Sequence, residues 1–216
     1  MKISAVIFDM DGLLIDSERL ALRAFQQICD RYEMGDQFAL YLQLLGTNQT
    51  TTQLILQREL DPRIEWQTFL QQWDEQYHAL TENGVPLMQG VINLLDYLDA
   101  RSIPLAVATS TNTQKALIKL EQSGIVHRFK TVTGGDQVNN GKPAPDIYLH
   151  AAQSLSVLPD QCIALEDSAN GTRAAVSAGM HTIQVPDLAP PDEALLALGH
   201  QVMDSLDEVI AYLDAR

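Results

Sequence analysis

Short apolar runs alternate with amphipathic stretches along most of the chain. Residues 91, 94, 95 and 98 are Val, Leu, Leu and Leu, which is the spacing of one face of a helix. Residues 206, 209, 210 and 213 repeat that spacing near the C-terminus. Because strands and helices alternate through residues 86–216, the pattern predicts an α/β fold with a parallel sheet covered by helices on both faces. The predicted strands are residues 3–8, 105–108, 131–133, 162–165 and 182–185.

The segment 17–84 interrupts this alternation with helical patterns only. Ala21, Ala24, Phe25 and Ile28 form an apolar stripe, and residues 50–60 and 66–80 also have helical character. The return to the sheet is marked by "ENGVPLMQG", which contains two glycines and a proline. We therefore expect two domains. Residues 1–16 and 85–216 form the sheet domain, and residues 17–84 form a helical insert after the first strand.

Composition excludes several classes of partner. The 216 residues carry a net charge of −14, which argues against nucleic acid and against anionic membranes. The apolar fraction of 46% is enough for a substantial core. Two isolated cysteines, Cys29 and Cys162, are typical of a reducing compartment, and the apolar run at the start is too short for a signal peptide. We expect a soluble, cytoplasmic monomer.

Acidic residues follow two of the predicted strands directly. Asp9 and Asp11 come after the first strand, where Gly12 permits a tight turn, and Glu166 and Asp167 come after residues 162–165. The carboxyl ends of parallel strands meet at one sheet edge, and four carboxylates gathered there would repel one another without a cation. Mg²⁺ prefers such oxygen ligands. A turn at Asp9 or a helix cap at Asp167 would explain one acid, but not the whole set.

Hydroxyl and amide side chains follow the strand at residues 105–108. Thr109, Ser110 and Thr111, with Asn112 after them, are suited either to capping the next helix or to holding an anion. The sequence leaves both interpretations open. Lys142, between Gly141 and Pro143, is either a solvated loop lysine or a partner for Asp9 and a phosphate.

Together these elements resemble the haloacid dehalogenase superfamily. "DMDG" at residues 9–12 is similar to its first motif, Thr109 to its second, Lys142 with Pro143 to its third and Glu166 with Asp167 to its fourth. "DSE", "KPAPDIY" and "LEDSANG" resemble the β-phosphoglucomutase-like branch, which has a helical cap on a Rossmann-like core. The resemblance covers nearly the whole chain and implies that residues 17–84 form the cap.

The resemblance implies a role for each matching residue. Asp9 would attack phosphorus, and Asp11 would exchange protons with the leaving group and with water. Mg²⁺ would be held by the Asp9 carboxylate, the backbone carbonyl of Asp11, and Asp167, with Glu166 close by. The phosphoryl group would be bound by Thr109 and Lys142, with Ser110 and Thr111 as further candidates in the same turn. An acid at position 11 favours phosphoryl transfer over the halide displacement of the dehalogenases.

The absence of certain basic residues from the insert restricts the class of substrate. No lysine lies between Lys2 and Lys115, which argues against a phosphonoacetaldehyde hydrolase, because that enzyme uses a cap lysine. Gly46 is followed by neutral residues, whereas relatives that bind a second phosphate have a basic residue shortly after this glycine. Asn48 and Gln49 are suited to sugar hydroxyls, or simply to the start of a helix. The possible substitutes for the missing basic residue are Arg19, Arg23 and Arg58.

These observations predict a Mg²⁺-dependent phosphatase. Its substrate would be a small phosphorylated metabolite, a sugar monophosphate, hydrolysed through an aspartyl-phosphate. The alternative is a sugar phosphomutase, with the same core and a cap that retains a bisphosphate. A non-catalytic binding protein is a third possibility, but such a protein would have no need of a nucleophile and an acid.

Overall fold

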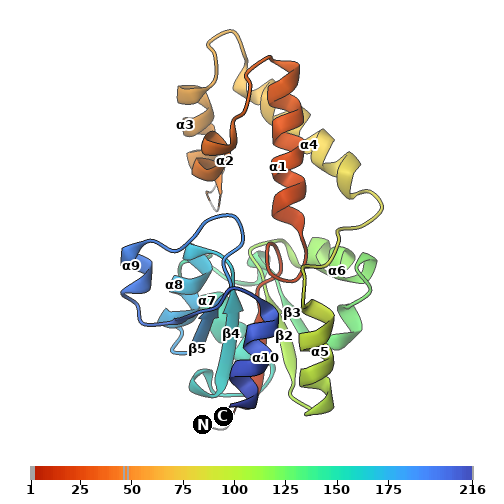
Figure 1. The fold of residues 1–216 in the computed structure, drawn as a ribbon, viewed down its shortest axis with the longest axis vertical. Coiled ribbons are helices and arrows are strands. Elements are labelled where there is room, and N and C mark those ends of the chain that lie inside the picture. Colours follow the sequence, from red (N-terminus) through yellow and green to blue (C-terminus); the bar gives the residue numbers. More distant parts are fainter. Residues whose placement is uncertain (1–2, 46, 48, 216) are drawn as a thin grey trace. The chain divides into compact units, whose positions relative to one another are not determined.

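The chain divides into two units in the computed structural model, which describes residues 3–45, 47 and 49–215. One unit joins residues 1–16 to residues 85–216, and the other consists of residues 17–84. Figure 1 labels most of their helices and strands. The first unit contains the sheet, and the second is helical.

All the strand pairings described in the first unit are parallel. The sheet has six strands in the order β3-β2-β1-β4-β5-β6. This confirms the predicted α/β class and places β1 in the middle, between β2 and β4. The strands are β1 (Ala5–Phe8), β2 (Leu105–Ala108), β3 (Thr131–Thr133), β4 (Cys162–Glu166), β5 (His181–Gln184) and β6 (Gln201–Val202).

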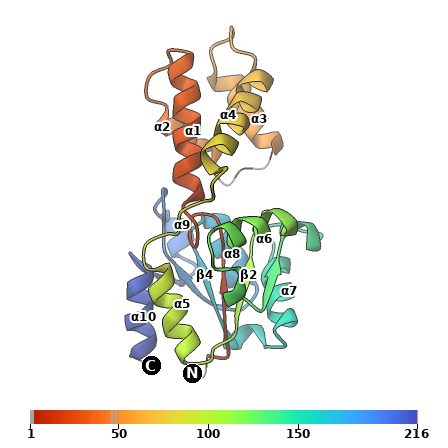
Figure 2. The same cartoon turned by 90° about the vertical axis from the view of Figure 1, so that its right-hand side faces the viewer.

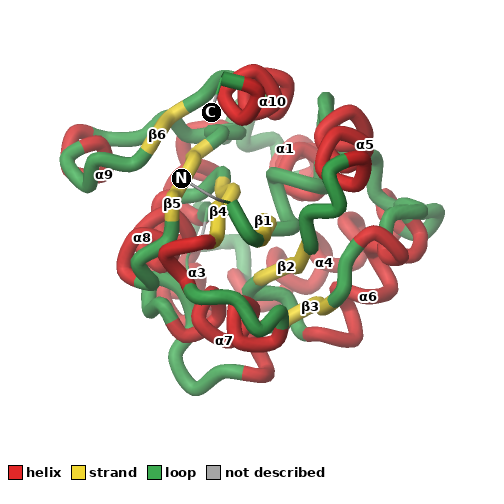
Figure 3. The backbone as a smooth tube through the Cα atoms, turned by 90° about the horizontal axis from the view of Figure 1, so that it is seen from below, coloured by secondary structure: helices red, strands yellow, loops and turns green. Residues whose placement is uncertain are grey.

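Helices cover both faces of this sheet. Figure 3 shows α5 and α10 on one face and α7 and α8 on the other. The helices of this unit are α5 (Val91–Ala100), α6 (Thr113–Gln122), α7 (Asp146–Ser154), α8 (Ala169–Ser177), α9 (Glu193–Leu196) and α10 (Leu206–Asp214).

Small side chains line the sheet face beneath α7 and α8. Ala5, Ala106 and Ala164 are all buried, and they form one core cluster with Ile147 and Ala151 of α7. Alanine brings no bulk to the interface, so the helix can pack closely on the strands. The start of α7 lies near the carboxyl end of the sheet, since Tyr148 in its first turn contacts Glu166, the last residue of β4.

The second unit consists of α1 (Ser17–Arg31), α2 (Phe38–Leu44), α3 (Gln49–Glu59) and α4 (Trp66–Thr81) (Figure 2). Phe25 is fully buried in its core. Its ring centroid lies 5.0 Å from that of Trp73 and 5.5 Å from those of Tyr41 and Phe69. The Trp73 indole N–H also donates to the Ala21 carbonyl at 2.9 Å, which ties α4 to α1. The stripe predicted in α1 is therefore a packing surface.

The structure contains short elements that the sequence pattern does not predict, among them three 3-10 helices at Val126–Arg128, Gly135–Gln137 and Pro159–Gln161. The others are α2, α9 and the edge strand β6, whose two residues are both exposed. Two exposed residues have no apolar alternation, so the pattern contains no sign of a strand there. Among the described residues, no helix combines the length and the apolar character needed to cross a bilayer.

Replacing Phe25 by alanine should destabilise the helical unit by about 3 kcal/mol, because it empties the centre of an aromatic cluster. Both tryptophans of the chain, Trp66 and Trp73, lie in α4, so tryptophan fluorescence during urea unfolding reports on this unit. Leu54→Ala is the matched control, since Leu54 is 59% exposed and should change stability by less than about 0.5 kcal/mol. Equal urea midpoints for both variants would contradict this account of the core.

Candidate active site

The pairing of β1 with β4 places two acids side by side. Phe8 is in register with Leu165, and the Asp9 backbone N–H donates to the Leu165 carbonyl at 2.9 Å. Asp9 is therefore next to Glu166, the last residue of β4. Asp9 is 6% exposed and Glu166 is fully buried.

Lys142 lies between these two carboxylates. It comes from the loop before α7, and its Nζ donates to Asp9 Oδ1 and, at 2.5 Å, to Glu166 Oε1. Its side chain is only 6% exposed. Tyr148 of α7 donates its hydroxyl to the same Glu166 oxygen at 2.8 Å, and its ring centroid lies 5.1 Å from Lys142 Nζ. The ammonium thus bridges two buried acids from different strands.

The other oxygen of Glu166 anchors the turn into α8. Glu166 Oε2 accepts from the Asp167 and Ser168 backbone N–H groups at 3.2 and 3.1 Å, and from Ser168 Oγ at 3.0 Å. Ser168 also caps α8, because its Oγ accepts from the Gly171 N–H at 3.1 Å. A Cβ atom at Gly171 would lie 1.7 Å from Glu166 Oε1. The carboxylate therefore occupies space that only glycine leaves open.

Asp11 has its own set of partners. Gly12 adopts a φ of 83°, which allows the chain to turn after β1. Thr111 Oγ1 donates to Asp11 Oδ2 at 2.8 Å, and Thr109 Oγ1 lies 3.5 Å from the same oxygen. Lys119 of α6 donates to Asp11 Oδ1 at 2.8 Å. The two aspartates that follow β1 are thus held by two different lysines.

Asp167 completes a group of oxygens that could hold a cation. One carboxylate oxygen each from Asp9, Glu166 and Asp167 lies within 4.8 Å of the others. The backbone carbonyl of Asp167 accepts from the Gln184 side chain at 3.1 Å, and Gln184 Oε1 lies 2.9 Å from His200 Nε2. Oxygen ligands only, in a largely buried cluster, fit a hard divalent ion such as Mg²⁺.

Electrostatics at the site also favour an added positive charge. Burial raises the pKa of the Asp9 carboxyl to about 8, and the Glu166 and Asp11 carboxylates add to the rise against the lowering effect of Lys142. Burial opposes the charge of Lys142, but Asp9 and Glu166 outweigh it and raise the pKa of its ammonium. Burial, followed by the charges of Glu166 and Asp9, also raises the pKa of Tyr148. One buried ammonium does not neutralise these acids.

The hydroxyl-bearing turn after β2 includes a helix cap. Asn112 Oδ1 accepts from two backbone N–H groups in the first turn of α6, at 3.0 and 3.4 Å. The capping interpretation is therefore confirmed for Asn112. Thr109 is 1% exposed and its Oγ1 accepts from the Thr111 N–H at 3.1 Å, whereas Ser110 is exposed. Anion binding by this turn stays a prediction.

The structure describes part of the segment that is expected to select the substrate. Gly46 and Asn48 lie outside the described residues, and so does the side chain of Gln49. Thr47 Oγ1 donates to the Leu44 carbonyl at 2.8 Å, which is a local contact. The arginines considered as substitutes lie on two helices. Arg58, in α3, forms an ion pair with Glu59 at 2.6 Å. Arg19 and Arg23 are exposed in α1.

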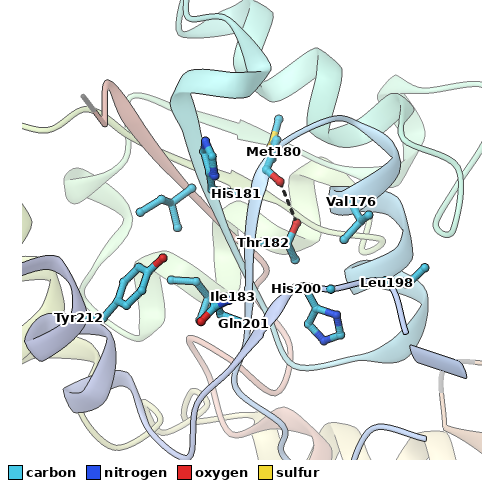
Figure 4. Close-up of a pocket in the computed structure, with 11 residues that line it drawn as sticks. Val176, Met180, His181, Thr182, Ile183, Leu198, His200, Gln201 and Tyr212 are labelled. Carbon is cyan, nitrogen blue, oxygen red and sulfur yellow. Dashed lines mark hydrogen bonds between the residues drawn. The ribbon is translucent and has the colours of Figure 1, made fainter. Parts of the chain in front are cut away.

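A cavity of about 220 Å³ lies beside β5 (Figure 4). The lining residues do not include Asp9, Asp11, Glu166 or Asp167, so it is not the site described above. Its wall includes His200, which supports Asp167 through Gln184. The other labelled lining residues are Val176, Met180, His181, Thr182, Ile183, Leu198, Gln201 and Tyr212.

Sequence reasoning missed four residues that shape this site. Tyr148 and Gly171 lie within the quoted motifs "KPAPDIY" and "LEDSANG", so the motifs could have pointed to them. Gln184 ends β5 in register with Glu166. Its place at the site could be predicted only from the order of the strands, which the sequence does not give. Lys119 has no local signal, because its contact with Asp11 depends on how α6 is placed.

Comparisons with known proteins agree with this arrangement. The sequence profile of haloacid dehalogenase-like hydrolases matches residues 6–185. A phosphorylated carbohydrates phosphatase of Thermotoga maritima is 32% identical over 210 residues, covering 97% of each chain. A fructose-1-phosphate phosphatase of Escherichia coli is 30% identical and covers 85% of this chain and 97% of its own.

A solved structure has the same fold. It is a haloacid dehalogenase family hydrolase from Deinococcus radiodurans, described with bound phosphate and sodium. Its TM-score is 0.81 at 28% identity, with 98% of this chain and 95% of that chain covered.

Replacing Gly171 by alanine should lower the melting temperature by several degrees. The added methyl group would displace Glu166 from its buried contacts, and forced overpacking typically costs about 1–3 kcal/mol. Gly141→Ala is the matched control, because its Cβ would meet nothing within 4 Å. Calorimetry of both variants makes the comparison. A Gly171→Ala protein that melts with the wild type would show that Glu166 is not fixed as described.

Proposed function

The chain belongs to the haloacid dehalogenase-like hydrolases, and from that premise we propose that it is a Mg²⁺-dependent phosphatase of small phosphorylated sugars. The two relatives named above, which it matches over most of its length, are phosphatases. The observation that carries the proposal is the convergence of Asp9, Lys142 and Glu166 at the carboxyl edge of β1 and β4. A carboxylate beside a buried ammonium is suited to attack a phosphoryl group whose charge that ammonium stabilises.

In the proposed reaction, Asp9 acts first. One of its carboxylate oxygens forms a bond to phosphorus while the bond from phosphorus to the leaving sugar oxygen breaks. Asp11 gives its proton to that oxygen, then takes a proton from the water that attacks phosphorus and releases Asp9. Lys142 holds the transferring group, and Thr109 and Ser110 are proposed to assist it.

The residues that would hold the ion are Asp9, Asp167 and the backbone carbonyl of Asp11, with Glu166 next to them. The oxygen cluster described above supports this assignment. Bound there, Mg²⁺ would neutralise charge on the phosphoryl oxygens and orient them for in-line attack. Glu166 has a second role, because it fixes Lys142 and the Asp167 turn through its own hydrogen bonds.

The substrate class is proposed from the relatives and from the insert. The relatives named above act on phosphorylated carbohydrates and on fructose 1-phosphate. Residues 17–84 are proposed to be the cap that selects the sugar, with the neutral residues after Gly46 contacting hydroxyls. We also propose a cytoplasmic monomer, and two buried free cysteines, Cys29 and Cys162, support the reducing compartment.

Purified protein should release inorganic phosphate from sugar monophosphates when Mg²⁺ is present, and EDTA should stop the release. A panel of sugar, nucleotide and short-chain acid monophosphates identifies the class. Asp9→Asn should reduce turnover by at least about 10³-fold, because it removes the nucleophile. The control is Asp204→Asn, an exposed acid, which should leave turnover unchanged.

Two results would count against this function. Undiminished turnover by Asp9→Asn would exclude an aspartyl-phosphate at that position. Movement of the phosphoryl group between carbons of one hexose phosphate, with no phosphate released, would instead establish the sugar phosphomutase.

Mg²⁺ should raise the melting temperature of the protein in the absence of any substrate. At a concentration about 100 times its dissociation constant, an ion that binds only the folded state adds about 2.7 kcal/mol, or roughly 5–10 °C. Asp167→Asn should abolish most of this rise, while Asp160→Asn, at an exposed acid, should keep it. An equal rise in Asp167→Asn would place the ion elsewhere.

A further inference from the structure

Lys119 lies outside the set of residues that the proposed reaction uses, but it contacts one of them. Its Nζ donates to Asp11 Oδ1 at 2.8 Å, and the two side chains are each 22% exposed. Thr111 Oγ1 donates to the other oxygen, Oδ2, at 2.8 Å. Each oxygen of the Asp11 carboxylate is therefore held by a donor that follows β2, one in the turn and one in α6.

Both donors lie within or just before α6, which is anchored to the rest of the unit. Asn112 caps the first turn of α6, and Ala116 and Leu120, four residues apart on one face of that helix, are buried. Asp11, by contrast, lies in a turn after its strand, next to a glycine with a positive φ. Without donors on both oxygens, its carboxylate would be free to rotate about its side-chain bonds. Lys119 and Thr111 fix the plane of the carboxylate with respect to the sheet edge.

We propose that Lys119 is a positioning residue, which orients the Asp11 carboxyl group so that its protonated form can give its proton to the leaving oxygen. The inference rests on the proposed function and deepens it. At this edge of the sheet, Lys119 contacts Asp11. In this role Lys119 acts through Asp11, whereas Lys142 contacts Asp9 and Glu166 directly.

A purely structural role is a weaker explanation of this contact. A partly exposed ion pair contributes little to folding, because solvent screens it and both side chains lose freedom. A displaced proton donor, by comparison, changes the rate steeply, since a misplacement of about 1 Å can cost roughly 10²-fold. The consequence of losing Lys119 should therefore be seen in catalysis rather than in stability.

The test compares two leaving groups in wild type and Lys119→Met. The sugar oxygen is a poor leaving group and needs a proton as its bond to phosphorus breaks, whereas the nitrophenolate of p-nitrophenyl phosphate leaves without one. For the best sugar monophosphate of the panel, kcat/KM should fall by about 10–100-fold. For p-nitrophenyl phosphate the fall should be less than about threefold, and inhibition by inorganic phosphate should be unchanged.

Three further variants distinguish a positioning role of Lys119 from a general disruption of the structure. Lys119→Arg should restore part of the lost rate with the sugar phosphate, because it restores a cationic donor. Lys115→Met, at an exposed lysine one turn earlier in α6, should match the wild type. Thr111→Val removes the donor on the other oxygen and should reproduce the same dependence on the leaving group, which keeps the test valid if Lys119→Met does not fold.

Equal losses with both esters, or no loss with the sugar phosphate, would overturn the positioning role and leave the phosphatase intact. A wild-type protein that hydrolyses neither ester would overturn the proposed function, and this inference with it.

Discussion

The site depends on one arrangement, a buried ammonium held between two buried carboxylates. Lys142 joins Asp9 of β1 to Glu166 of β4, and none of the three side chains has much access to water. Buried charges are tolerated only when they are paired and hydrogen-bonded, so the loop before α7, the strand ends and the start of α8 must all be placed together. The acids still outnumber the lysine, which makes this edge of the sheet a place where a cation and a phosphoryl group complete the charge balance.

Strand pairing and small residues in the sheet domain produce that arrangement. Parallel pairing of β1 with β4 places Asp9 beside Glu166, and alanines on the sheet face let α7 pack closely enough for Tyr148 to reach Glu166. Gly171 leaves room for the same carboxylate. These contacts are steric as well as electrostatic. The same residues therefore determine both the packing of the helices on the sheet and the position of the charged groups at its edge. Asp11 is held separately through Lys119, which allows the two aspartates different environments although they are two residues apart.

Much of this could be predicted from the sequence, because its signals are local. Buried strands appear as apolar runs, and acids directly after such runs must meet at one edge when the strands are parallel, as Asp9 and Glu166 do. The residues that escaped prediction depend on tertiary placement. The contact of Lys119 requires the position of α6, and the steric role of Gly171 requires the direction of the Glu166 side chain. The strand β6 is two exposed residues at the sheet edge, and two residues are too few to form a period.

The central claim is that Asp9 becomes covalently phosphorylated, and chemical trapping tests it most directly. Enzyme quenched during turnover and treated with borohydride should contain homoserine at position 9, because borohydride reduces an acyl phosphate but leaves a free carboxylate unchanged. Mass spectrometry of the peptide around residues 5–18 would locate it. The account predicts homoserine at position 9, dependent on substrate, with Asp11 unchanged. Active enzyme that gives no homoserine there, or gives it at another acid, would contradict the account.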